Sequence, residues 1–187
     1  MTTLRIYDLR DGRVLALDLR DLIDLLAPRS LEASWTVSPV NVEYPKLGRS
    51  IDQFEMTGPG RPGEDQLELL AASGSSVSGL MLAEYAHATH QVIWGQFVAT
   101  HPEQTDAWVV IRAIDSTFYE VTTSDDTVLA KIRSAYKDVR VASGPVASTP
   151  FSQVPREGDR YVAPNNEPVE MTGTFGDTQI KIPLKST

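Results

Sequence analysis

Residues 91–141 decide the fold of this chain and read QVIWGQFVATHPEQTDAWVVIRAIDSTFYEVTTSDDTVLAKIRSAYKDVRV. Three apolar runs rich in β-branched and aromatic residues predict strands at residues 92–99, 107–114 and 117–122. The apolar period then changes from two to 3.6, which is typical of a helix with one buried face. That face carries Val128, Leu129, Ile132, Ala135 and Tyr136. We therefore predict three strands followed by a helix, which Ser124 caps at its start.

The residues before this stretch predict further strands and helices. Residues 4–7 predict a short strand, and residues 19–26 place their leucines on one helical face. Pro28 ends that helix, because its ring disfavours the α conformation in the preceding residue. The alternation of apolar and polar side chains over residues 31–37 predicts a half-buried strand. Two more helices are expected, over residues 64–72 and from Ser76 or Ser78 to about His90.

Beyond residue 141 the chain changes character. Prolines punctuate the sequence at positions 145, 150, 155, 164 and 168, and few apolar residues recur with a regular period. We predict an α+β fold, with a mainly antiparallel β-sheet and about three α-helices packed on one face. Residues 1–141 would form this single domain. Residues 142–187 would form an irregular Pro-rich extension that wraps the domain and ends in an edge strand at residues 180–184.

Composition narrows the classes of function. The chain has 17 basic and 25 acidic side chains, a net charge of −8, and no basic patch that would favour nucleic acid as a partner. No apolar run approaches the roughly 20 residues that a membrane helix needs, and the N-terminus has no apolar leader segment. The absence of cysteine excludes a disulfide framework and a thiol nucleophile. These features predict a soluble, cytoplasmic protein.

Three motifs resemble catalytic or cofactor sites but lack an essential feature of them. Residues 58–63 match G-x-G-x-x-G, yet Pro59 and Pro62 have no N–H to offer a phosphate. Residues 74–78 nearly match the serine-hydrolase motif, but position 78 is serine instead of glycine. Glu84, His87 and His90 stand three residues apart, which does not bring three ligands to one metal. The sequence therefore predicts no catalytic residue, no metal site and no cofactor.

The most suggestive feature is an acidic segment between His101 and Asp126. It has one basic residue and six acidic ones, so it carries −5 of the net charge of −8. The acids lie mostly at predicted turns and at the start of a helix, where side chains tend to be exposed. The six residues are Glu103, Asp106, Asp115, Glu120, Asp125 and Asp126. We predict that they form a face that attracts a basic protein, as in an immunity protein or an antitoxin that neutralises a cationic toxin.

Two alternatives stay open. Arg112 interrupts an apolar strand, on the face of Trp108 and Ile114 if the strand is regular, and a buried arginine needs a carboxylate partner. Glu120, across the predicted hairpin, would supply it. A small enzyme or ligand-binding domain would then use a pocket between sheet and helices, with a site drawn from Arg112, Glu120, His87 and His90. The third alternative is a subunit of a larger assembly, including a homo-oligomer.

Overall fold

The computed structural model describes residues 1–44, 49–58, 61–104 and 106–142. The predicted Pro-rich extension lies outside the described residues from position 143 on. None of the helices in the described ranges is long and apolar enough to cross a membrane.

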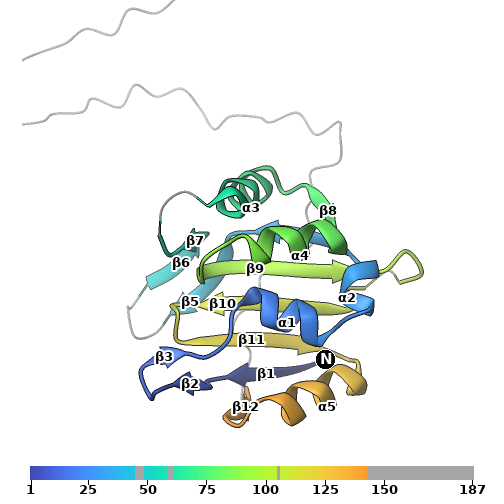
Figure 1. The fold of residues 1–187 in the computed structure, drawn as a ribbon. Helices are drawn as coiled ribbons and strands as arrows, with labels where there is room; N and C mark the ends of the chain where they lie inside the picture. The colour runs from blue at the N-terminus through green and yellow to red at the C-terminus, as the bar shows by residue number, and fades with distance from the viewer. Residues whose placement is uncertain (45–48, 59–60, 105, 143–187) are drawn as a thin grey trace, which may run out of the picture. The chain divides into compact units, whose positions relative to one another are not determined.

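The described part of the chain contains an eight-stranded sheet in which every pairing is antiparallel. Its strands are β1 (Thr2–Ile6), β4 (Ser34–Ser38), β7 (Glu55–Met56), β8 (Ser76–Ser78), β9 (Val92–Thr100), β10 (Val109–Ile114), β11 (Phe118–Thr123) and β12 (Val139–Val141). They lie in the order β12-β1-β11-β10-β9-β4-β8, and β7 pairs with the first residues of β9 (Figure 1). The three central strands, the antiparallel sheet and the α+β class are confirmed.

Two short hairpins stand apart from this sheet. One joins β2 (Leu9–Arg10) to β3 (Val14–Leu15), and the other joins β5 (Val40–Tyr44) to β6 (Arg49–Gln53). Pro39 lies between β4 and β5, where the sequence pattern changes parity. The chain leaves the large sheet at this proline, which has no N–H for a sheet hydrogen bond.

Five helices occur in the described residues, more than the about three of the predicted fold, and four of the five match helices predicted individually from the hydrophobic pattern. The five are α1 (Leu19–Leu25), α2 (Arg29–Glu32), α3 (Pro62–Ser73), α4 (Gly79–His87) and α5 (Asp126–Ala135). The unexpected helix is α2, which occupies residues that we predicted to begin a strand. A buried chain of hydrogen bonds holds this turn: Ser30 Oγ donates to the Ile23 carbonyl, and Trp35 Nε1 donates to the Ser30 carbonyl. Local alternation cannot reveal such a tertiary contact.

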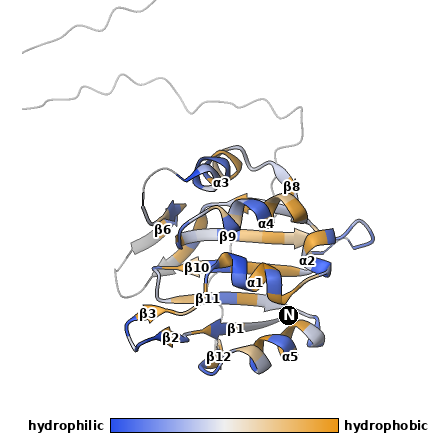
Figure 2. Ribbon diagram, in the orientation of Figure 1, coloured by the Kyte–Doolittle hydropathy of each residue, from blue (hydrophilic) through white to orange (hydrophobic). Residues whose placement is uncertain are grey.

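One face of the sheet packs against the helices and forms the main core. Residues of α1, α3, α4 and α5 share one buried cluster with the side chains that β1, β4, β9, β10 and β11 direct to this face. Its largest fully buried members include Trp35, Tyr119 and Phe97. Figure 2 shows hydrophobic and hydrophilic segments alternating along α1 and α5, as expected of helices with one buried side. The prediction of helices on one face of the sheet is confirmed.

The opposite face of the sheet carries a second apolar cluster and a row of polar side chains. The β5–β6 hairpin contributes Val40, Val42 and Ile51 to this cluster, which also contains Trp94 and Ile114. Beside it, the cross-strand register aligns one polar residue from each of five neighbouring strands. They are Ser38, Gln96, Arg112, Glu120 and Arg5.

Hydrogen bonds connect this polar row across the sheet. Arg112 Nε donates to Gln96 Oε1 at 2.7 Å, and Arg5 Nε donates to Glu120 Oε1 at 3.1 Å. The Glu120 side chain is only 2% exposed, so its charge is compensated by the arginines on either side instead of by water. Burial lowers the pKa of Arg112, while the charge of Glu120 raises it, and the net shift is downward.

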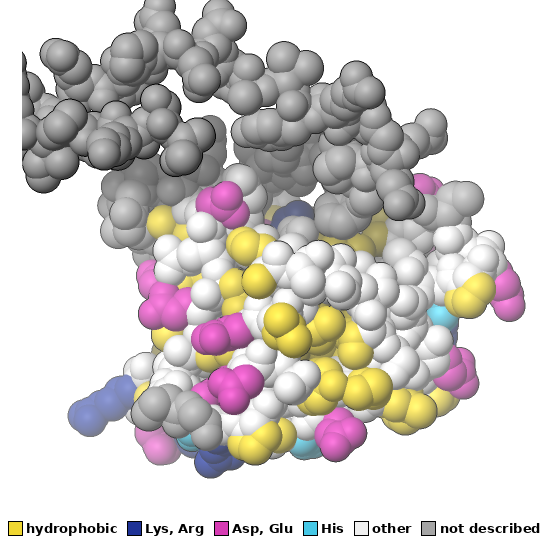
Figure 3. Space-filling view, turned by 90° about the horizontal axis from the view of Figure 1, so that it is seen from above, with side chains coloured by type: hydrophobic (Ala, Val, Ile, Leu, Met, Phe, Trp, Pro, Cys, Tyr) yellow, Lys and Arg dark blue, Asp and Glu magenta, His cyan; other side chains and the backbone are white. Residues whose placement is uncertain are grey.

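Hydrophobic side chains also reach the surface. Leu69 on α3 and Leu80 and Met81 on α4 are each at least 45% exposed. Figure 3, seen from above, shows hydrophobic side chains on this face with acidic ones scattered between them. The homo-oligomer remains a prediction. An interface between two copies of the chain would bury exposed apolar side chains of this kind.

The polar row gives a test of the fold. Replacing Glu120 with glutamine removes the negative charge between Arg5 and Arg112, and we expect the free energy of unfolding to fall by about 3 kcal/mol. The matched Glu103→Gln substitution, at an exposed loop position, should change it by less than about 0.5 kcal/mol. Urea denaturation measures both, and equal effects would contradict the structural role of Glu120.

Candidate functional site

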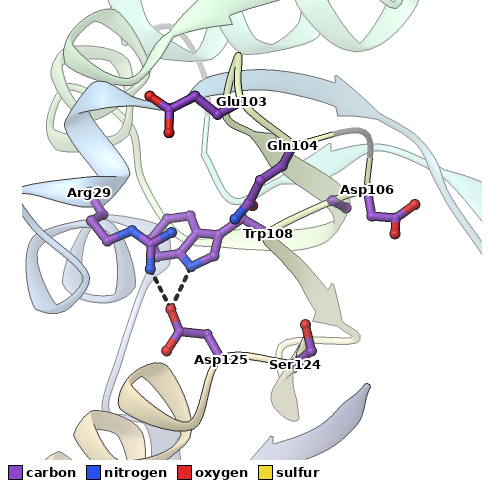
Figure 4. A pocket seen from close by; sticks show the side chains of 8 residues that line it. Arg29, Glu103, Gln104, Asp106, Trp108, Ser124 and Asp125 are labelled. Carbon is purple, nitrogen blue, oxygen red and sulfur yellow. Dashed lines mark hydrogen bonds and ion pairs between the residues drawn. The ribbon is translucent and has the colours of Figure 1, made fainter.

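A polar cavity of about 520 Å³ lies at one end of the central strands, where β9 and β11 end and β10 begins. Two loops and the short helix α2 surround it (Figure 4). Its lining consists of Arg29, Glu103, Gln104, Asp106, Ala107, Trp108, Ser124 and Asp125. Three carboxylates and one guanidinium therefore line the same cavity.

A second cavity of about 200 Å³ adjoins the first. Both cavities are lined by Arg29, Trp108 and Asp125, and the smaller cavity is the more apolar of the two. The remaining lining of the smaller cavity is Leu26, Ala27, Pro28, Thr127, Val128 and Lys131.

Asp125 is the centre of the site. Its Oδ1 accepts hydrogen bonds from the backbone N–H groups of Thr127 and Val128, at 2.8 and 3.4 Å, and so caps helix α5. Its Oδ2 accepts from Trp108 Nε1 at 3.0 Å and from Arg29 Nη1. The prediction that Ser124 caps this helix was wrong by one residue: the longer aspartate side chain serves both the helix and the cavity.

These contacts shift the acidity of Asp125. Burial raises the pKa of the carboxyl group, but the hydrogen bonds from Trp108, Thr127 and Val128, together with the charge of Arg29, outweigh burial and lower it below its ordinary value of 3.8. Asp125 is therefore a carboxylate at neutral pH, and each of its two oxygens already accepts two hydrogen bonds.

Arg29 reaches the cavity from the first residue of α2. Its guanidinium carbon lies 4.6 Å from the centre of the Trp108 ring, in a cation–π contact, while Nη1 bonds Asp125 (Figure 4). Close packing fixes α2 itself, because a Cβ atom on Gly79 would come within 2.0 Å of the Ser30 carbonyl oxygen. Glycine at this position lets the first turn of α4 lie directly against α2.

Lys131 connects α5 to the segment between α1 and α2. Its Nζ donates to the carbonyl oxygens of Leu25 and Ala27, both at 3.2 Å. These are the orphan carbonyls at the end of α1, which a lysine side chain can satisfy. The ammonium group is thereby engaged with the backbone just before Arg29.

Trp108 was predicted on the sheet face of Arg112, and this was wrong. The strand β10 begins only at Val109, and Trp108 packs in the helix-side core, 4% exposed. The His101 ring lies 5.0 Å from its ring, and the buried His101 Nε2 has no hydrogen-bond partner among the described residues. Sequence reasoning missed both Trp108 and Arg29 as members of the site, since nothing local links Arg29 to a carboxylate 96 positions away.

The structure divides the six predicted partner-binding acids. Glu103, Asp106 and Asp125 line the cavity, and the exposed Asp126 follows Asp125 at the start of α5. Asp115 lies in the turn after β10, at the far end of that strand. Glu120 lies in the middle of the sheet, bound to Arg5. The six do not form one continuous face, because a sheet about six residues long separates its two ends by roughly 20 Å.

The residues of the alternative ligand site are also separated. Arg112 and Glu120 stand opposite each other in the register of β10 and β11, as predicted, but on the sheet face away from the helices. His87 Nε2 lies 3.1 Å from Asp24 Oδ1 on α1, whereas His90 Nδ1 lies 2.6 Å from Glu64 Oε1 on α3. No group of three or more potential metal ligands gathers within the described residues.

No protein-family model, curated protein or solved structure matches this chain. The assignment of a role to the cavity therefore rests on its own chemistry.

The acidity of Asp125 gives a test of this geometry. Its lowered pKa contributes stability that is fully present above pH 3.8 and is lost as the pH falls through the lower folded-state value. The Asp125→Asn variant keeps a capping oxygen but loses the charge, so at pH 7 it should be less stable than the original protein by about 1 kcal/mol.

This difference should stay constant between pH 8 and pH 5 and shrink below pH 4, as followed by thermal unfolding of both proteins. A difference that grows on acidification would contradict the assigned hydrogen bonds. Asp126→Asn, on the exposed neighbour, is the matched control.

Proposed function

We propose that this protein is a non-catalytic binding module that receives cationic side chains of a basic protein partner at the cavity beside Asp125. The observation that carries the proposal is the state of Glu103 and Asp106 on the cavity rim. Both are exposed, and neither makes a hydrogen bond or an ion pair with a described residue. Two carboxylates beside a hollow, without a partner in the described part of the chain, can pair with cations that arrive from outside.

The charge of the whole chain supports this proposal. A net charge of −8 produces a long-range field that attracts a basic protein and speeds its association. Asp126, exposed at the start of α5, adds a further negative charge next to the cavity. In Figure 4 the carboxylates of Glu103 and Asp106 lie well apart, so a partner with several basic residues suits the rim better than a single small cation.

The chemistry of Asp125 favours binding over catalysis. A general base needs a free lone pair and a pKa near the working pH. Asp125 accepts from four donors and its pKa is lowered, so it neither takes up a proton at neutral pH nor has an open position for one. The site is suited to holding positive charge.

The alternative of a ligand-binding domain built on Arg112 and Glu120 has less support. Arg112 donates to Gln96 and Glu120 accepts from Arg5, so both side chains are engaged inside the polar row. Such a row is explained by the need to compensate buried charge. We also propose a cytoplasmic location, which the composition of the sequence predicts.

A charge-reversal comparison of peptides tests the proposal. The protein should bind an arginine- and lysine-rich peptide and should not bind an acidic peptide of equal length, as measured by fluorescence anisotropy. Removing the two rim charges in Glu103→Gln/Asp106→Asn should weaken binding at low salt about tenfold, which corresponds to roughly 0.7 kcal/mol for each charge. Binding should also weaken steeply as salt is added.

The matched control is Asp65→Asn/Glu68→Gln, which removes two exposed charges from α3, outside the cavity lining. It should weaken binding less than twofold, in proportion to net charge alone. If the two double variants lost equal affinity for the basic peptide, the interaction would be general charge attraction, and the proposed site would be wrong.

A further inference from the structure

Arg29 already shows how the site holds a cation. Its guanidinium lies over the Trp108 ring at 4.6 Å and bonds the same Asp125 oxygen that accepts from Trp108 Nε1. Stacking on an aromatic face and in-plane bonding to a carboxylate are the two contacts that a planar guanidinium makes best. The chain thus contains a formed guanidinium subsite, with its own arginine in it.

Arg29 is weakly held there. Its side chain is 44% exposed, and among the described residues its guanidinium makes an ion pair with Asp125 and a cation–π contact with Trp108. The backbone of α2 is fixed by packing and hydrogen bonds, so only the side chain of Arg29 has to move. Exposed ion pairs and cation–π contacts each contribute only about 1 kcal/mol or less, so the side chain can leave by rotation about its own bonds.

The departure of Arg29 would uncover a complete site. Asp125 Oδ2 would keep its hydrogen bond from Trp108 and gain one open acceptor position. The face of the Trp108 ring that Arg29 covers would become free toward the cavities of about 520 and 200 Å³, both of which Arg29 lines. Oδ1 would stay bound to Thr127 and Val128, so helix α5 would keep its cap and the carboxylate its orientation.

We propose that an arginine of the partner takes the place of Arg29 in the subsite formed by Trp108 and Asp125, and that Arg29 acts as an internal competitor. This inference rests on the proposed function and names the side chain that is recognised. Arginine is preferred to lysine, because a planar guanidinium can stack on the ring while its N–H groups bond the carboxylate. An ammonium group is not planar and cannot make both contacts in this way. If Arg29 fills the subsite nine-tenths of the time, the apparent affinity is reduced about tenfold.

The Trp108 indole N–H is a direct reporter of this exchange. Its signal in a ¹H–¹⁵N spectrum can be assigned among the three tryptophans by the Trp108→Phe substitution. The probes are L-argininamide, L-lysinamide and the neutral isostere L-citrullinamide, each titrated into the original protein and into Arg29→Ala. Argininamide should move the Trp108 signal of Arg29→Ala at about one-tenth of the concentration that the original protein requires.

Three further measurements define the outcome. Lysinamide should bind Arg29→Ala more weakly than argininamide, and citrullinamide should leave the signal unchanged, because it lacks the charge. Adding Asp125→Asn to Arg29→Ala should abolish the response to argininamide. Equal affinity of the original protein and Arg29→Ala, or equal binding of citrullinamide, would overturn the exchange.

Failure of the exchange is distinguishable from failure of the proposed function. If Arg29→Ala gains no affinity for argininamide but Glu103→Gln/Asp106→Asn still weakens binding of the basic peptide, the rim binds the partner and the exchange is wrong. If neither variant has its expected effect, both proposals are wrong.

Discussion

The antiparallel register of β9, β10 and β11 is the constraint on which the rest of the structure depends. Side chains of a strand alternate between the two faces of its sheet, so a single register decides the surroundings of every residue in the three strands. Here it sends Phe97, Ile111 and Val121 to the helix-side core. It sends Gln96, Arg112 and Glu120 into one row on the other face. A shift by one residue would bury the charged row under the helices.

The ends of the same strands create the cavity. Because β9 and β11 end where β10 begins, their connections meet at one edge, and α5 starts there with Asp125 as its cap. One carboxylate then serves three purposes: it caps a helix, fixes the indole of Trp108 and holds Arg29. The site is stiff at Asp125, where helix and sheet support it, and adjustable at Arg29, whose long side chain is partly in water.

Acidic residues in this chain therefore have different roles despite their closeness in sequence. Glu120 and Asp125 compensate internal cations, whereas Glu103 and Asp106 remain without partners among the described residues. The count of charges between His101 and Asp126 could not separate these cases. The alternation in β11 did contain part of the answer, since it places Glu120 on the same sheet face as the arginine opposite, while the loop residues obey no such rule.

The sequence by itself determined the elements whose signal is local. The strands β9 to β11, the helices α1, α3, α4 and α5, and the stop at Pro28 follow from hydrophobic period and backbone restriction, and all lie within a few residues of where the pattern puts them. Only the tertiary structure decided that residues 29–32 form a helical turn, that Trp108 leaves the face of Arg112, and that Arg29 meets Asp125. These outcomes depend on contacts between segments far apart in the chain, which no local pattern records, because the energy that selects them comes from packing and charge compensation in the folded molecule.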